Sequence, residues 1–151
     1  MKIFFTILVL VTSFTIRLNA EENISAKASK FAAKDVTVEE ADKLIAGIPE
    51  LIVLDVRTPE EFEHEHIKGA VNVNLFDSNF LKLVSDLDQS KPLLVHCASG
   101  RRSVSALTKM AGKTKFPAIY HMHDGFNGWK NAKKPFESKP LPKDLKYIPA
   151  K

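Results

Sequence analysis

The residues best suited to nucleophilic chemistry in this 151-residue chain lie together in one segment: Cys97, Ala98, Ser99, Gly100, Arg101, Arg102 and Ser103. Cys97 is the only cysteine of the chain. A thiol reacts as its thiolate, and free backbone amides or nearby cations lower the thiol pKa from about 8.5 to roughly 3.5–7.5. Gly100 permits a tight turn, and Arg101 and Arg102 bring positive charge. The segment therefore predicts an anion-binding loop around an ionised Cys97.

The alternative is that Cys97 is a buried apolar residue, which is the usual fate of a lone cysteine. The flanking segments favour the functional interpretation. Leu93–His96 predicts a buried strand and Arg102–Ala111 has a helical pattern, so Cys97 ends a strand. A strand that turns directly into a helix leaves backbone N–H groups free to bind an anion. Loops at this end of an open parallel sheet also line the ligand crevice.

Strand and helix patterns alternate along the chain. Capping boxes at Thr37–Glu40 and Thr58–Glu61 mark two helix starts. Apolar runs without alternation indicate strands that are buried on both faces, as in a parallel sheet. The patterns predict helices at 37–46, 58–63, 78–87, 102–111 and 126–132, and strands at 51–54, 70–73, 93–96 and 118–121. This order predicts an α/β fold built on a parallel sheet.

Composition excludes several other classes of protein. The chain is 44% hydrophobic and 26% charged, which excludes a disordered tail, a collagen-like fibre and a multi-span membrane protein. A single cysteine excludes a disulfide framework and a zinc site built on paired cysteines. The net charge of +4 is spread along the chain, so we expect no nucleic-acid partner. The pairs His64 with His66 and His121 with His123 lack a third ligand, so we expect no metal site.

Four ordered motifs carry a resemblance to a known family: Leu54–Phe62, His66–Asn72, Cys97–Ser103 and Gly125–Trp129. Their order and spacing resemble a single-domain rhodanese, of the thiosulfate sulfurtransferase-like kind, over residues 35–134. The resemblance implies a rhodanese-like α/β fold with a five-stranded parallel sheet and helices on both faces. Together with the N-terminal pattern described below, the chain is most similar to the small exported rhodaneses of bacteria, of the phage shock protein E type.

This resemblance implies a sulfurtransferase that needs no cofactor. The Cys97 thiolate would take the outer sulfur of a small anionic donor such as thiosulfate, hold it as a persulfide, and pass it to a thiophilic acceptor, cyanide or a thiol. The amides from Ala98 to Ser103 would stabilise each anionic state in turn. Arg102, more than Arg101, would attract and orient the donor.

The same resemblance places Asp55 and Arg57 near the loop, where they would support it, and a structural ion pair is one form of that support. Two other functions stay open. A cysteine phosphatase of a related fold has five residues between cysteine and arginine, which would put the arginine at position 103, where this chain has Ser103. A non-catalytic rhodanese-like binding domain would usually lack the cysteine that is present here.

Residues 1–20 predict a secretory signal peptide, because a short basic start precedes the uncharged apolar run Ile3–Ile16. That run is shorter than the roughly 20 residues needed to cross a bilayer, so we expect cleavage and no stable membrane anchor. A cut after Ala20, or after Ala28 as the second choice, would release the protein into the periplasm or the extracellular space.

The expected organisation is a signal peptide over 1–20, a rhodanese domain over 35–134 and a Pro/Lys-rich C-terminal tail over 135–151. From Lys133 onward the chain holds four of its eight prolines and six lysines. Such a composition is typical of an extended segment that packs on a domain surface or stays free of it. The sequence leaves the oligomeric state open.

Overall fold

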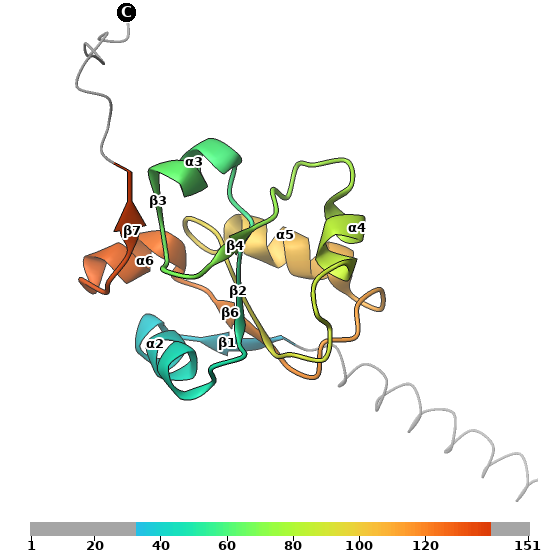
Figure 1. Cartoon of the computed structure of the whole chain (residues 1–151), viewed down its shortest axis with the longest axis horizontal. Coiled ribbons are helices and arrows are strands. Elements are labelled where there is room, and N and C mark those ends of the chain that lie inside the picture. Colours follow the sequence, from blue (N-terminus) through green and yellow to red (C-terminus); the bar gives the residue numbers. More distant parts are fainter. Residues whose placement is uncertain (1–32, 140–151) are drawn as a thin grey trace, which may run out of the picture. The chain divides into compact units, whose positions relative to one another are not determined.

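The strands of this protein form a parallel sheet with helices on both sides (Figure 1). The computed structural model describes residues 33–139, so the predicted signal peptide and the last twelve residues of the predicted tail, 140–151, lie outside the described residues. The strand order is β1-β6-β5-β2-β4. These strands span Lys34–Val36 (β1), Ile119–Met122 (β6), Leu93–His96 (β5), Ile52–Asp55 (β2) and Val71–Asn72 (β4).

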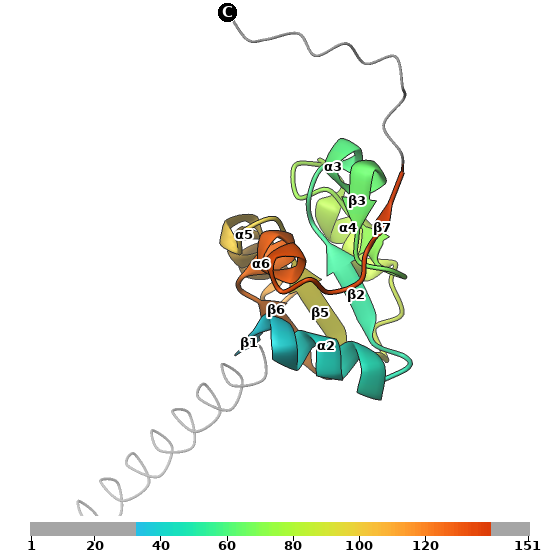
Figure 2. The same cartoon turned by 90° about the vertical axis from the view of Figure 1, so that its left-hand side faces the viewer.

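Two pairs of helices cover the two faces of the sheet. Helices α2 and α6 pack on one face, and α4 and α5 pack on the other (Figures 1 and 2). Helix α3 follows β2. The helices span Val38–Gly47 (α2), Pro59–His64 (α3), Phe80–Ser85 (α4), Arg101–Met110 (α5) and Gly125–Asn131 (α6). The predicted fold, an α/β rhodanese-like fold with a five-stranded parallel sheet and flanking helices, is confirmed.

The register of the strands brings their carboxyl ends to one edge. Asp55 at the end of β2 lies opposite His96 at the end of β5, and Val36 of β1 lies opposite Met122 of β6. All four residues of β5 are buried, as expected for a central parallel strand. Burying a leucine or valine completely contributes about 1.5–3 kcal/mol, so β5 is firmly held. The residue that follows it is therefore presented from a rigid support.

Both predicted capping boxes form. The Thr37 hydroxyl accepts from the amide of Glu40 at 3.2 Å, and the Thr37 amide donates to the Glu40 carboxylate at 2.9 Å. Thr58 and Glu61 repeat the arrangement at the start of α3. Each threonine cap contributes about 1 kcal/mol. These two boxes fix where α2 and α3 begin.

The predicted helix at 78–87 is shorter than expected. Helix α4 spans only Phe80–Ser85. The Asp77 carboxylate accepts from the Asn79 amide at 2.7 Å, which holds the preceding chain in a turn. At the other end, the Leu87 amide donates to the Val84 carbonyl, a tighter pattern than an α-helix. A turn held by the Asp77 side chain at the start and a tighter backbone turn at the end therefore shorten this helix.

Three short strands escape prediction because they lack an apolar run. One is β1, a polar three-residue strand at the edge of the sheet. The others are β3 (Glu65–His66) and β7 (Glu137–Ser138), which pair antiparallel.

The Trp129 indole also donates to the carbonyl of Pro135 at 2.9 Å. The first part of the predicted tail thus packs against the domain. Among residues 33–139, no helix has the length and apolar character needed to cross a membrane.

Candidate active site

Cys97 directly follows β5 and is 1% exposed. The chain then turns at Gly100, with φ 82°, and α5 begins at Arg101. This is left-handed backbone, which favours glycine. A Cβ atom at Gly100 would also collide with the carbonyl oxygen of His123. The turn therefore depends on glycine both for its conformation and for its close packing against the end of β6.

The start of α6 holds the other side of this loop. The Phe126 amide donates to the Cys97 carbonyl at 2.7 Å, and the Asn127 amide donates to the Ala98 carbonyl at 2.9 Å. A Cβ atom at Gly125 would collide with the Ala98 carbonyl group. Two of the loop's carbonyls thus face α6 and are bonded there. Amides elsewhere in the loop stay available to the sulfur.

Several donors converge on the Cys97 sulfur. The Ser103 hydroxyl lies 3.6 Å from Sγ. Burial raises the pKa of the Cys97 thiol, but hydrogen bonds from the Ser103 hydroxyl and from the backbone of Ser103, Ser99 and Arg102 outweigh it, so the pKa lies below its usual value. These groups stabilise the thiolate, which is the form that acts as a nucleophile. The backbone of Ser99, Arg102 and Ser103 and the Ser103 hydroxyl therefore gather around the Cys97 sulfur.

A surface pocket of about 380 Å³ adjoins this loop, lined by Leu75, Phe76, Ser99, Arg101, Arg102 and Ser105. Three of the predicted loop residues, Ser99 and the two arginines, are among its walls. Ser103 is buried, and Ala98 and Gly100 face the β6–α6 turn instead. Cys97 itself is buried and does not line the pocket, but Ser99 and Arg102, whose backbones bond the sulfur, connect the pocket to it.

Three pocket residues were not predicted. Leu75 and Phe76 come from the segment between β4 and α4, and Ser105 comes from α5. Ser105 stands four residues after Arg101, so helical spacing could have found it. Phe76 is 69% exposed, which is unusual for so large an apolar side chain. Only the folded chain shows that it stands beside the loop.

Arg102 has a partner that sequence reasoning missed. Its guanidinium donates to both carboxylate oxygens of Glu61, with N···O distances of 2.6 and 2.7 Å. The side-chain hydrogen bonds from Arg102 lower the pKa of Glu61 to about 2. Glu61 also caps α3, and that role gave no hint in the sequence of a second contact 41 residues away. The positive charge expected at Arg102 is therefore partly compensated.

Asp55 and Arg57 form a buried ion pair beside the loop. The Arg57 Nη2 atom lies 2.6 Å from Asp55 Oδ2, and the side chains are 5% and 0% exposed. The same Nη2 donates to the Glu65 carbonyl, and the guanidinium lies 4.3 Å from the centre of the Phe126 ring. The pair therefore joins β2, β3 and α6. None of its described bonds reaches Cys97, so its contribution to the loop is indirect.

Two buried histidines flank the cysteine on opposite faces of the sheet. His96 packs against Phe126, and within residues 33–139 its Nε2 has no hydrogen-bond partner. Burial lowers the pKa of His96 and so favours its neutral ring. His121 instead bonds Ser103 on one side and Asp35 on the other. His121 was considered in the sequence only as half of a metal pair, and no cluster suited to a metal ion occurs within 33–139.

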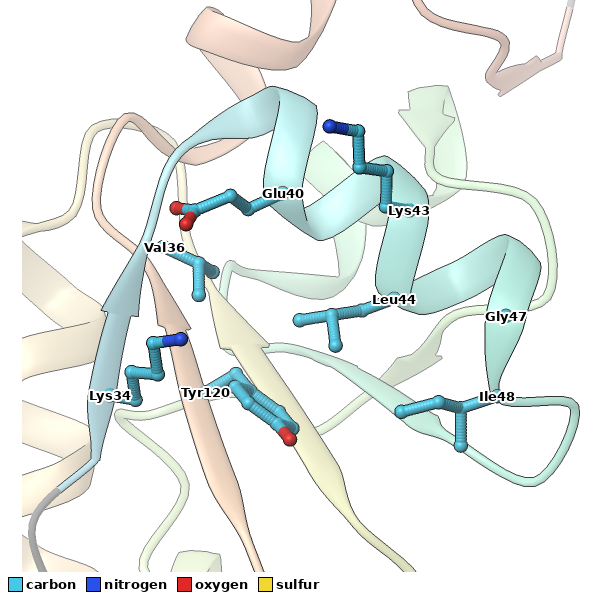
Figure 3. A pocket seen from close by; sticks show the side chains of 8 residues that line it. All are labelled: Lys34, Val36, Glu40, Lys43, Leu44, Gly47, Ile48 and Tyr120. Carbon is cyan, nitrogen blue, oxygen red and sulfur yellow. The ribbon is translucent and has the colours of Figure 1, made fainter.

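A second pocket, of about 310 Å³, lies on the other face of the sheet (Figure 3). Its walls come from α2 and from β1 and β6, and include Lys34, Leu44 and Tyr120. Val36 belongs to the core beneath α2 and α6, whereas Cys97 belongs to the core beneath α4 and α5. The sheet therefore separates this pocket from the sulfur.

The family follows from comparison with known sequences. Residues 37–132 match the Rhodanese-like domain family. The chain belongs to the rhodanese family. Rhodanese-like domain-containing protein 17 of Arabidopsis thaliana is 35% identical to this rhodanese over 124 residues, 74% of this chain and 76% of that protein. Thiosulfate sulfurtransferase 16, chloroplastic, of the same plant is 38% identical over 98 residues, 58% of this chain and 78% of that protein.

One further protein sequence and one solved structure extend the comparison. Thiosulfate sulfurtransferase GlpE of Pseudomonas syringae is 32% identical to this rhodanese over 79 residues, 52% of this chain and 72% of that protein. A crystal structure of a rhodanese-related protein from Thermoplasma volcanium superposes with a TM-score of 0.59 at 23% identity. That match covers 69% of this chain and 97% of the other. At this identity the superposition shows the shared fold.

Proposed function

We propose that this rhodanese is a sulfurtransferase that moves one sulfane sulfur from a small anionic donor, such as thiosulfate, to a thiophilic acceptor through a persulfide on Cys97. The observation that carries the proposal is the convergence of the Ser103 hydroxyl and the amides of Ser99, Arg102 and Ser103 on a sulfur beside an arginine-lined pocket. Relatives named as thiosulfate sulfurtransferases support the same reaction class.

The reaction consists of two displacements on sulfur. In the first, the Cys97 thiolate attacks the outer sulfur of thiosulfate, the S–S bond of the donor breaks, and sulfite leaves with the bonding electron pair. In the second, cyanide or a thiolate attacks the outer sulfur of the persulfide and the Cys97 thiolate is regenerated. The leaving group departs as an anion in each step, first sulfite and then the Cys97 thiolate, so no proton has to be delivered. This is covalent catalysis by an ionised nucleophile.

The loop suits both anions that this cycle requires. A disulfide-type S–S bond is about 2.0 Å long, so the negative end of the persulfide moves only that far from Sγ. Preorganised amides stabilise charge without reorienting during the reaction. The amides of Ser99 and Ser103 can therefore serve the thiolate and the persulfide in turn. Arg101 and Arg102 at the pocket wall add a field that favours an anionic donor.

Intact-mass measurement gives the direct test. Thiosulfate should add one sulfur atom to the wild-type protein, and cyanide should remove it with release of one thiocyanate. Cys97→Ser should show neither step. If the wild-type protein acquires no sulfur from thiosulfate or from other anionic persulfide and polysulfide donors, the proposal is wrong.

The geometry gives less support to a cysteine phosphatase. Such an enzyme needs an acid for the leaving group, yet Asp55 is buried in its pair with Arg57. Asp124 is nearly half exposed and its carboxylate lies 3.5 Å from His123 Nε2. Release of phosphate from an aryl phosphate without sulfur uptake would favour this alternative. Binding of an anion or a protein with neither reaction would favour a non-catalytic domain.

A further inference from the structure

Asp35 and His121 point toward the face of the sheet that carries α5. They are opposite each other in the register of β1 and β6. Their strand neighbours Lys34, Val36 and Tyr120 point toward α2 (Figure 3). Because side chains alternate along a strand, Asp35 and His121 face the other way. This is the face on which Cys97 is buried.

A continuous chain of polar contacts joins Asp35 to the Cys97 sulfur. Asp35 Oδ1 lies 2.7 Å from His121 Nδ1, and His121 Nε2 lies 2.8 Å from Ser103 Oγ. Ser103 Oγ in turn lies 3.6 Å from Cys97 Sγ. His121 is 4% exposed, whereas the Asp35 side chain is 73% exposed. The chain therefore runs from solvent to a buried sulfur.

The Ser103 hydroxyl has a single proton and three acceptors within reach. These are Cys97 Sγ, the Gly100 carbonyl at 2.7 Å and, when it carries no proton, His121 Nε2. An ionised Asp35 only accepts, so His121 Nδ1 carries a proton. When Nε2 is bare, it competes for the proton of Ser103. When Nε2 is protonated, it donates to Ser103 Oγ and leaves the hydroxyl proton for the other two acceptors.

We propose that His121, held by Asp35, is a positioning residue that turns the Ser103 hydroxyl toward the Cys97 sulfur and holds the proton that the thiol gives up. This inference rests on the proposed sulfurtransferase function. When the thiol ionises, its proton passes to Ser103 Oγ, and the original Ser103 proton passes to His121 Nε2. The sulfur then accepts a hydrogen bond from Ser103. No proton leaves the chain, and the imidazolium lies between two anions.

The groups around His121 support this role. On β1 it faces the carboxylate of Asp35, and on β5 its register partner is the apolar Val95. From α5 it meets Ser103 and, through it, Cys97. His123, in the turn after β6, is instead nearly half exposed, and its Nε2 lies 3.5 Å from the Asp124 carboxylate.

The test is the pH dependence of Cys97 alkylation by iodoacetamide in the full-length protein. In His121→Gln the side chain can still donate to Ser103 but cannot take up a proton. The midpoint of the alkylation profile should rise by about one pH unit, which is roughly a tenfold slower reaction at a pH below the midpoint. Ser103→Ala should raise it similarly, and the double variant should add little, since both act through one hydrogen bond.

His123→Gln is the matched control and should leave the midpoint unchanged. Asp35→Asn, a change at an exposed position, should raise the midpoint by a smaller amount. This variant replaces His121→Gln in the test if His121→Gln does not fold. An unchanged midpoint in folded His121→Gln and Asp35→Asn, or a shift fully additive with that of Ser103→Ala, would overturn the inference. Sulfur uptake from thiosulfate, measured separately by mass, tests the proposed function independently of these profiles.

Discussion

The guanidinium of Arg102 meets the carboxylate of Glu61 through two hydrogen bonds, of 2.6 and 2.7 Å, that tie the first turn of α5 to the first turn of α3. A two-point pair of this kind fixes the direction of the guanidinium as well as its place. Arg102 lines the pocket, so Glu61 sets how much of its positive charge an approaching anion encounters. Donor binding should therefore respond to both partners.

Replacing Glu61 by glutamine should strengthen donor binding. Glutamine can still complete the capping box with Thr58, but it no longer compensates Arg102. We expect the KM for thiosulfate to fall roughly two- to fivefold with little change in kcat, the size of a partly exposed charge interaction. Because Arg102 lowers the pKa of Glu61 to about 2, the carboxylate is charged throughout neutral and mildly acidic pH. The gain should thus be the same across that range.

Glu60→Gln provides the matched control for this change. Glu60 lies in the same helical turn but does not pair with Arg102, so the KM should match that of the wild type. Steady-state kinetics at low and high salt would check the cause, since added salt should shrink the gain. An unchanged KM in Glu61→Gln at low salt would contradict the expected role of the pair.

Arg102→Ala should weaken the use of anionic donors more than Arg101→Ala does. The sequence already predicts this order of the two arginines, and the pair between Arg102 and Glu61 adds a second reason. Loss of Arg102 leaves the Glu61 carboxylate uncompensated beside the pocket, whereas loss of Arg101 removes one positive charge only, since Arg101 makes no ion pair within 33–139. Adding Glu61→Gln to Arg102→Ala should therefore recover part of the lost kcat/KM. Equal losses in the two arginine variants, or no recovery in the double variant, would count against this view.

The wild-type thiol should react well below the pH at which free cysteine does. Burial raises the pKa of Cys97 but the hydrogen bonds from Ser103 and the loop amides lower it more, so the thiolate persists at lower pH than in an unfolded chain. The ionised Cys97 therefore stabilises the fold above the pKa that its thiol has in the unfolded chain. This stabilisation is lost as the pH falls through the thiol pKa of the folded protein. Alkylation at pH of about 6 should outpace that of a model thiol of pKa about 8.5. A profile like that of the model thiol would refute the expected ionisation.

Local signals in the sequence predicted most of the fold. Both capping boxes and the buried run Leu93–His96 appear as expected, because each depends on neighbours close in the chain. Strand β1 was missed because Lys34–Val36 is stabilised by pairing with β6, more than eighty residues away. The same applies to β3 and β7, which stabilise each other.

In the candidate site, too, features that depend on neighbouring residues were predictable, and contacts between distant residues were not. The loop from Cys97 to Ser103 is contiguous, so its residue types and spacing alone indicated it as a candidate site. Glu61 and His121 reach the loop only through the tertiary fold, and the sequence offers another interpretation of each, as a helix cap or as half of an incomplete metal pair. When a residue type already has a local explanation, a single sequence therefore does not reveal its contacts with distant parts of the chain.

Removing Arg57 should destabilise the protein strongly. Asp55 would be left fully buried and without its main partner, and breaking a buried pair in this way costs about 3–5 kcal/mol. Arg57→Ala should therefore lower the free energy of unfolding, measured in urea, by that order. Lys82→Ala is the matched control, because its pair with Asp86 is well exposed and contributes at most about 1 kcal/mol. Similar losses in the two variants would mean that the buried pair does not stabilise the fold more than an exposed one.

Gly100→Ala should disrupt the active loop far more than Gly112→Ala does. Both glycines have positive φ, 82° and 70°, so both substitutions carry the cost of left-handed backbone, about 1–2 kcal/mol. A Cβ atom at Gly112 would meet nothing within 4 Å, whereas one at Gly100 would collide with the His123 carbonyl. The difference between the two variants isolates this close approach. Gly112→Ala should keep sulfur uptake near the wild-type rate, and Gly100→Ala should lose most of it, with thermal unfolding measured alongside. If both variants load sulfur equally, the contact between the loop and the end of β6 does not shape the site.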